Sequence, residues 1–148
     1  LSALRFGDFT GDGKADVLSR AGGQWSISVG GTAAWTKLNT LSEHLDLVQL
    51  ADVDGNGTDD IVRFKTLSEK KGAWLVSWSV RTPWRSLRTV VFPGPPTAPR
   101  KPLVFPKLFV GQFDGLPGDD LLFVDYERVG QIYSHRRKTL LIHNQYPY

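Results

Sequence analysis

The stretch Gly7-Asp8-Phe9-Thr10-Gly11-Asp12-Gly13-Lys14-Ala15-Asp16-Val17-Leu18 joins two apolar runs through a loop rich in oxygen atoms and glycine. The pattern returns as Ala51-Asp52-Val53-Asp54-Gly55-Asn56-Gly57-Thr58-Asp59-Asp60-Ile61-Val62. A third, less complete copy is Gly111-Gln112-Phe113-Asp114-Gly115-Leu116-Pro117-Gly118-Asp119-Asp120-Leu121-Leu122. Each copy predicts a strand, a turn whose oxygen atoms can face inward, and a second strand.

A second marker repeats together with the loop. Trp25 and Trp35 are ten residues apart, and so are Trp74 and Trp84. Two markers in the same register indicate an internal repeat. Because apolar residues alternate with polar ones, the repeated unit is expected to be a four-stranded antiparallel sheet of roughly 40–50 residues, which is typical of a β-propeller blade. The predicted fold class is therefore all-β, with about two and a half blades.

The repeats divide the chain into four parts. We expect a single propeller segment over 1–148, with one blade at about 3–40 and a second at about 47–92. A proline-rich stretch at 93–106 is interpreted as an insertion between blades rather than as an extended ligand for a partner domain. A partial third blade at about 107–148 is expected to lack a clear fourth strand before Tyr148.

The alternation also predicts where the large side chains lie. Trp25, Trp35, Trp74 and Trp84 are expected in the core between blades, because residues that recur in register serve what every blade shares. In the second unit Trp78 and Val80 are expected on the bulky face of the third strand. A polar hairpin tip is expected over 66–72.

Composition excludes several classes of protein. The 148 residues are 41% hydrophobic and 22% charged, which is a globular composition. The absence of Cys excludes disulfides and thiolate metal sites, although it does not exclude an extracellular location. No apolar run has the length of a membrane helix, so membrane insertion is not expected. The net charge is +3, and the basic run over 135–138 is interpreted as a solvated hairpin tip rather than a nucleic-acid contact.

The first two loops predict calcium sites. Calcium prefers six to eight oxygen ligands, which a tight glycine-rich turn can supply from alternate positions and from the main-chain carbonyl at position seven. Counting from Asp8 and Asp52 as position one, ligands are expected at positions one, three, five, seven and nine. They are Asp8, Thr10, Asp12, Lys14 and Asp16 in the first loop, and Asp52, Asp54, Asn56, Thr58 and Asp60 in the second.

The two loops are not EF-hands, and the third loop is not expected to bind calcium tightly. An EF-hand needs Glu at position twelve and flanking helices, whereas position twelve is Ser19 or Arg63 and the flanks are strand-like. The second loop is the better site, since Thr10 is a weaker third ligand than Asp54. The third loop, at 112–120, is degenerate because Gln112, Leu116 and Pro117 replace oxygen ligands or a glycine.

These residues resemble FG-GAP/VCBS-type repeats, the calcium-loop blades of integrin α-subunit propellers and of the Psathyrella velutina lectin type. The segment Phe6–Leu18 is similar to that repeat, and Ala51–Val62 is nearly as similar. The resemblance implies that calcium stiffens the turn between the first two strands of each blade. Such propellers usually have six or seven blades, so this chain is expected to be a segment of a larger propeller or to be completed by further copies.

Two functions follow as expectations. The first is a non-catalytic, calcium-dependent module that binds glycans or proteins, with Trp78 and Trp84 as candidate ligand-binding residues. The second is a structural or docking segment of a larger secreted enzyme or toxin-like assembly. Catalysis by this chain is not expected, because His44, His135 and His143 lie in unrelated contexts without a nucleophile motif. A secreted or cell-surface location is expected, without nucleic acid as a partner.

Overall fold

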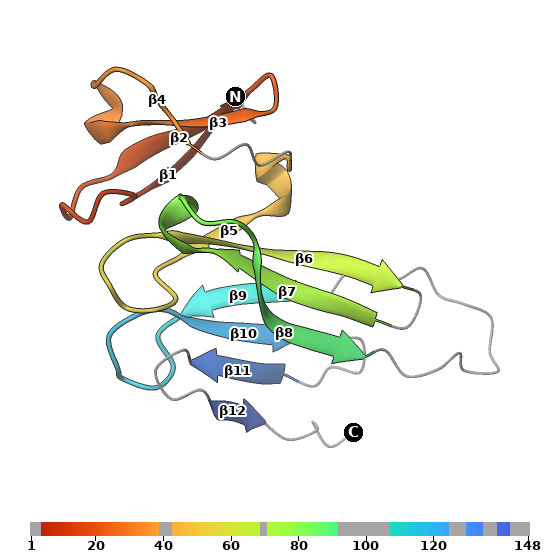
Figure 1. Cartoon of the computed structure of the whole chain (residues 1–148). Coiled ribbons are helices and arrows are strands. Elements are labelled where there is room, and N and C mark those ends of the chain that lie inside the picture. The colour runs from red at the N-terminus through yellow and green to blue at the C-terminus, as the bar shows by residue number, and fades with distance from the viewer. Residues whose placement is uncertain are drawn as a thin grey trace.

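The chain forms three four-stranded antiparallel sheets that follow one another along the sequence (Figure 1). The computed structural model describes residues 4–38, 43–68, 71–91, 107–124, 130–134 and 139–142. Within these ranges there is no α-helix, and the helical elements are three short 3-10 turns. The expected all-β class and the four-stranded antiparallel units are therefore confirmed.

The first sheet pairs its strands in chain order. It contains β1 (Leu4–Gly7), β2 (Asp16–Ala21), β3 (Gln24–Ser28) and β4 (Thr36–Lys37), with the 3-10 turn η1 (Val29–Gly31) between β3 and β4. The first glycine loop, residues 8–15, joins β1 to β2. Gly7 pairs with Asp16 and Phe6 with Val17, so the loop closes directly onto the sheet register.

The second sheet has the same order and longer central strands. After η2 (Leu45–Leu47) come β5 (Gln49–Ala51), β6 (Asp60–Ser68), β7 (Lys71–Ser77), η3 (Trp78–Val80) and β8 (Arg85–Val91). The pairing of β6 with β7 continues to Ser68 and Lys71. Most residues of the polar hairpin tip predicted at 66–72 therefore belong to β6 and β7.

The third unit is a complete sheet, which corrects the predicted partial blade. It contains β9 (Lys107–Gly111), β10 (Asp120–Val124), β11 (Gly130–Ser134) and β12 (Thr139–Ile142). β11 and β12 pair with each other, so Thr139–Ile142 is the fourth strand that the prediction lacked. The absence of a tryptophan pair in this unit had hidden the β11–β12 hairpin.

Two hydrophobic cores hold the three sheets in sequence. The first core joins Leu18, Trp25 and Ile27 of the first sheet to Ile61 and Val80 of the second unit. The second core joins residues of the second sheet to residues of the third. It includes Val62, Trp74, Val76, Leu108, Leu121 and Phe123. Each sheet thus packs one face onto its neighbour, as Figure 1 shows for the sheets of β1–β4, β5–β8 and β9–β12.

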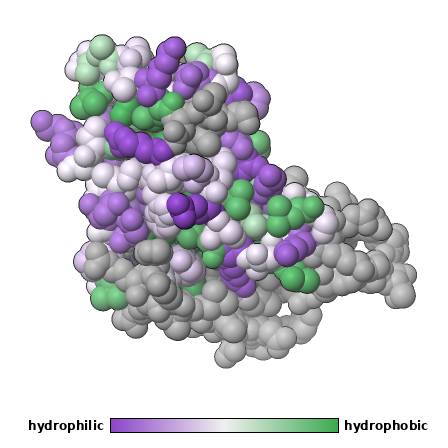
Figure 2. Space-filling model, in the orientation of Figure 1, coloured by the Kyte–Doolittle hydropathy of each residue, from purple (hydrophilic) through white to green (hydrophobic). Residues whose placement is uncertain are grey.

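Three of the four paired tryptophans lie in the cores, and one does not. Trp25 and Trp74 are buried, and Trp84 is half-buried against the first core. Trp35 is 54% exposed, so its predicted place in the core is wrong. It precedes the two-residue strand β4, whereas the aligned Trp84 precedes the seven-residue strand β8. Figure 2 shows apolar side chains reaching the surface in separate places, including the region of the first sheet.

Trp78 and Val80 do not continue the third strand, which corrects the predicted alternation. They belong to η3, where Ser79 and Val80 have φ of 48° and 59°. The aligned residues of the first unit are Gly30 and Gly31, which adopt the same left-handed conformation without steric cost. Val80 is strained in this conformation, but its side chain is buried in the first core, which holds the turn in place.

Some expectations fall outside the described residues. They include the interpretations of the proline-rich stretch 93–106 and of the basic run 135–138. Among the residues that are described, no helix is long and apolar enough to cross a membrane.

Candidate metal centre

The three glycine loops lie beside one another at one end of the sheets (Figure 1). Each loop connects the first two strands of its sheet: β1 to β2, β5 to β6, and β9 to β10. Main-chain hydrogen bonds join the first loop to the second and the second to the third. The candidate ligand residues therefore occupy the same place in each unit and form one continuous edge.

The second loop brings three carboxylates together. Asp52, Asp54 and Asp60 each offer an oxygen atom, and these atoms lie within 4.8 Å of one another. Carboxylate oxygens at this spacing are the ligands that a hard cation such as calcium prefers. Asn56 and Thr58 lie beside them, and the Asn56 Oδ1 atom accepts a hydrogen bond from the Thr58 main-chain N–H at 2.7 Å. The donor set of this loop fits a calcium ion.

The first loop is arranged differently. Among the described residues, only the second loop gathers three carboxylates, so Asp8, Asp12 and Asp16 do not form an equivalent group. The Asp8 carboxylate instead accepts hydrogen bonds from the main-chain N–H groups of Gly11 at 2.6 Å and Gly13 at 2.7 Å. Desolvation opposes the charged form of Asp8, but these N–H groups outweigh it and hold its pKa below the usual value.

The remaining predicted ligands of the first loop serve the turn itself. Asp12 Oδ1 accepts a hydrogen bond from the Lys14 main-chain N–H at 2.9 Å. The main-chain N–H of Thr10 donates to Asp8 Oδ1 at 3.1 Å. Thr10, Asp12 and Lys14 are exposed. In the first loop these groups thus hydrogen-bond within the turn, whereas in the second loop three carboxylate oxygens lie within 4.8 Å of one another.

The carboxylate at position nine has the same structural role in all three loops. Asp16, Asp60 and Asp120 are buried, and each accepts a hydrogen bond from the main-chain N–H at position two of its own loop. Asp16 and Asp60 also accept from the left-handed turns, through the N–H groups of Gly30 at 2.9 Å and Ser79 at 2.7 Å. The position-nine residue therefore ties each loop to its sheet.

The burial of Asp60 makes it sensitive to pH. Desolvation raises the pKa of Asp60 to about 7, and the nearby Asp54 charge adds to the rise, while the Ser79 N–H opposes it. The folded chain thus holds a proton on Asp60 at pH values where the unfolded chain has lost it. Stability from this residue is present below its unfolded pKa of 3.8 and is lost as the pH rises toward 7.

We therefore expect a pH-dependent melting temperature without calcium. In buffer with chelator, the contribution of Asp60 should fall between about pH 4 and pH 7, by about 1.4 kcal/mol for each unit of raised pKa. Asp60→Asn removes the titrating group, so the difference between the pH profiles of the two proteins isolates Asp60. Thermal unfolding followed by circular dichroism measures it. Parallel pH profiles would contradict this expectation.

In the third loop a side-chain amide lies where the other loops have a carboxylate. Gln112 Oε1 accepts hydrogen bonds from the main-chain N–H groups of Asp114 and Gly115, at 3.2 and 2.9 Å. Gln112 Nε2 donates to the carbonyl oxygens of Leu116 and Gly118, the latter at 2.8 Å. Gly118 is at position seven, whose carbonyl is an expected calcium ligand in the other loops. The Gln112 Nε2 group thus donates a hydrogen bond to the carbonyl that is expected to face a calcium ion in the other loops.

Replacing this amide should weaken the third loop. Gln112→Ala removes four hydrogen bonds from an exposed turn, and we expect a loss of about 1–2 kcal/mol in the free energy of unfolding. Gln112→Glu keeps the acceptor but turns an oxygen toward the carbonyls of Leu116 and Gly118, so it should also destabilise the chain in the presence of chelator. Urea denaturation measures both variants. Unchanged midpoints for both would show that the amide contributes nothing.

Residues at position eight, which were not among the predicted site residues, join neighbouring loops. The Asp59 N–H donates to the Asp8 carbonyl at 2.6 Å, and Asp59 Oδ2 accepts from the Asp8 N–H at 2.8 Å. Asp119 repeats this arrangement on Asp52, with distances of 2.6 and 2.9 Å. Burial raises the pKa of Asp59. The signal in the sequence was the aspartate shared by the second and third loops at this position.

The two candidate ligand-binding tryptophans lie on opposite faces of the second sheet. Trp78 packs against the second core, whereas Trp84 packs against the first. The Arg63 guanidinium lies over the Trp84 ring, 5.5 Å from its centroid, and pairs with Glu43. Trp78 and Trp84 are half-buried and do not line a common site. Any ligand contact by one would therefore be independent of the other.

Comparisons with protein-family models, with curated proteins and with solved structures each gave no match.

Proposed function

We propose that this chain is a calcium-stabilised β-propeller segment that acts as a non-catalytic binding module for glycans or proteins. The observation that carries the proposal is the group of Asp52, Asp54 and Asp60 oxygens within 4.8 Å of one another. When Asp60 loses its proton, the three carboxylates repel one another, and a divalent cation offsets that repulsion. Binding calcium would stiffen the turn between β5 and β6.

In this proposal the ion is held by the second loop first. Asp52, Asp54 and Asp60 supply carboxylate oxygens, Asn56 an amide oxygen and Thr58 its main-chain carbonyl. The first loop, with Asp8, Thr10, Asp12, Lys14 and Asp16, is a second and weaker calcium site. Calcium supplies charge neutralisation and cross-linking of the turn, with no part in a reaction. A secreted or cell-surface location suits such a module.

The ligand would bind at the edges of the sheets rather than in a catalytic pocket. Trp78 and Trp84 remain the proposed stacking residues, one on each face of the second sheet. Aromatic rings that are half-buried offer a rigid apolar face to a sugar ring or an apolar side chain. Each residue also packs against a core, so substitutions there need a parallel measurement of stability.

A second candidate function is a structural or docking segment of a larger assembly. It is favoured by apolar side chains left exposed on the outer sheets, Phe6 at 64% and Phe113 at 44%. On the third sheet Phe109 is also exposed, at 50%, and apolar residues that are exposed together mark surfaces that other proteins cover. In this case the chemistry or recognition would belong to the neighbouring part of the assembly.

Binding to a glycan array with and without calcium separates the two functions. A calcium-dependent module should bind a defined glycan in calcium, lose that binding in chelator, and lose it in Trp78→Ala or Trp84→Ala. Trp35→Ala, which changes an exposed tryptophan, is the matched control and should bind as the parent does. Binding that is equal in calcium and chelator would contradict the proposal, and no binding under either condition would favour the docking segment.

A further inference from the structure

The two interfaces between the sheets are built from the same parts. In each, the position-eight aspartate of the later loop makes two hydrogen bonds to the main chain of position one in the earlier loop. Asp59 does so to Asp8, and Asp119 to Asp52. We call this pair of hydrogen bonds the aspartate clamp. A Cβ atom on Gly7 would overlap the Asp59 carboxylate, so the aspartate clamp fits closely over the end of β1.

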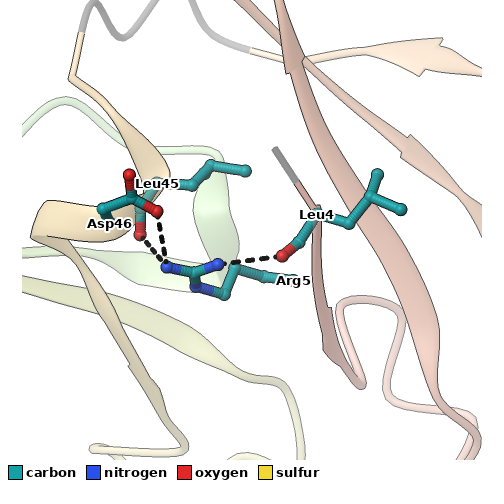
Figure 3. A network of polar contacts seen from close by, with 4 residues as sticks. All are labelled: Leu4, Arg5, Leu45 and Asp46. Carbon is teal, nitrogen blue, oxygen red and sulfur yellow. Dashed lines mark hydrogen bonds and ion pairs between the residues drawn. The ribbon is translucent and has the colours of Figure 1, made fainter. Parts of the chain in front are cut away.

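Two further contacts accompany this aspartate clamp. The apolar residue at position two, Phe9 or Val53, is 0% and 2% exposed, because the next sheet covers it. The residue three before position one reaches into the next unit. Arg5 donates to the Leu45 carbonyl at 2.8 Å and pairs with Asp46 at 3.3 Å, as Figure 3 shows. Gln49 donates to the Leu108 carbonyl at 3.2 Å.

The third sheet has residues at the positions that receive the next sheet in the first two units, and here these residues are exposed. Phe113, at position two, is 44% exposed, and Phe109, three before position one, is 50% exposed. Among the described residues, the main-chain N–H and carbonyl of Gln112 contact no partner. The Phe113 ring lies over Gly111, 3.2 Å from a Cβ built there, in the place where Asp59 lies over Gly7. We call Phe109, Gln112 and Phe113 the open face.

The first sheet presents the opposite half of such an interface, but without the clamp. Its Phe6 is 64% exposed, whereas the aligned Leu50 and Val110 pack against the first and second cores. Position eight of its loop is Ala15, which has no carboxylate to offer. A second copy of the chain would therefore bring apolar contacts to the open face and would leave the Gln112 N–H without its acceptor.

We propose that the open face is a docking surface for a further four-stranded sheet that carries aspartate at position eight of its glycine loop. The incoming carboxylate accepts the Gln112 N–H, and the incoming main-chain N–H donates to the Gln112 carbonyl. Phe113 moves off Gly111 and, with Phe109, is covered by the incoming apolar residues. This inference does not depend on calcium, because the internal clamps consist of main-chain and carboxylate groups alone.

The chain itself can be made to supply the missing group. Ala15→Asp places a carboxylate at position eight of the first loop, on an exposed residue, so that one copy can dock on the open face of another. Such contacts are heterologous and extend the assembly at its ends. Sedimentation velocity over a range of concentrations should show that Ala15→Asp associates at least tenfold more tightly than the parent, with oligomers that lengthen as concentration rises.

Matched variants identify the surfaces involved. Ala15→Leu adds bulk without an acceptor and should sediment as the parent does. Phe113→Ser, made in the Ala15→Asp chain, should return it to the parent's behaviour, and made alone it should leave the melting temperature unchanged. The proposal is overturned if Ala15→Asp associates no more tightly than the parent, if Ala15→Leu associates as tightly as Ala15→Asp, or if Phe113→Ser does not weaken association. Failure of calcium binding would leave these outcomes unaffected.

Discussion

Calcium is expected to raise the melting temperature of this chain, and Asp60→Asn is expected to remove most of that rise. A ligand that binds only the folded state stabilises it by about 4 kcal/mol when its concentration is a thousandfold above the dissociation constant. Asp60 is the buried member of the Asp52–Asp54–Asp60 group, so its loss removes a ligand that solvent cannot replace. Scanning calorimetry in calcium and in chelator measures the effect.

The quantity to compare is the calcium-induced shift within each protein, since Asp60→Asn also disturbs two hydrogen bonds. Asp60 accepts from the Val53 and Ser79 N–H groups, and an amide can satisfy only one of these donors. Asp46→Asn removes an exposed carboxylate outside the loops and should keep the full shift. If the melting temperature of the parent chain is the same in calcium and in chelator, the proposed calcium site is wrong.

Trp25→Ala is expected to destabilise the chain by about 3–5 kcal/mol, and Trp35→Ala by no more than about 0.5 kcal/mol. Trp25 is completely buried between the first two sheets, so its truncation leaves a cavity among Leu18, Ile27 and Leu45. Trp35 is 54% exposed. The two residues form one of the repeated tryptophan pairs, which makes them a matched comparison.

Urea denaturation with tryptophan fluorescence and circular dichroism measures both variants. The fluorescence baselines will differ because each variant loses an emitter, so the circular dichroism midpoint decides. Equal losses for Trp25→Ala and Trp35→Ala would contradict the arrangement of the first sheet. That result would indicate that both tryptophans lie in the core, as the sequence pattern had predicted.

The loops and their flanking strands were predictable because the chemistry there is local. Glycine and aspartate at fixed spacing define a turn within a dozen residues, and β1–β2 and β5–β6 follow from it. The third sheet was only partly predicted, because β11 carries no marker that resembles Trp25 or Trp74. Its strands are set by pairing with β10 and β12, which the sequence of β11 alone does not reveal.

Burial was harder to predict than strand position. The alternation that correctly placed Trp25 and Trp74 in the cores placed Trp35 there as well, because a repeat pattern cannot show where a strand shortens. Val80 illustrates the opposite case. It is buried, but through a left-handed turn rather than a strand, and only packing against the first sheet makes that conformation tolerable for a β-branched residue.

The candidate site likewise has a part that could be predicted from the sequence and a part that could not. The oxygen-bearing residues of the second loop could be identified from their spacing, and the structure brings Asp52, Asp54 and Asp60 together. The first loop has the same number of aspartates at the expected ligand positions without the same grouping, since the Asp8 carboxylate is directed to main-chain N–H groups. The roles of Asp59 and Asp119 depend on contacts between units, which spacing within one loop does not contain.

The aspartate clamps also determine which amides report on which part of the chain. The N–H groups of Asp8 and Asp52 are held by carboxylates of the following unit. Their hydrogen exchange with solvent therefore requires the neighbouring sheet to detach, even if their own sheet stays folded. Slow exchange at Asp8 measures the attachment of the second sheet, and slow exchange at Asp52 measures that of the third. The exchange rates of these two amides thus show whether the second and third sheets detach separately or together.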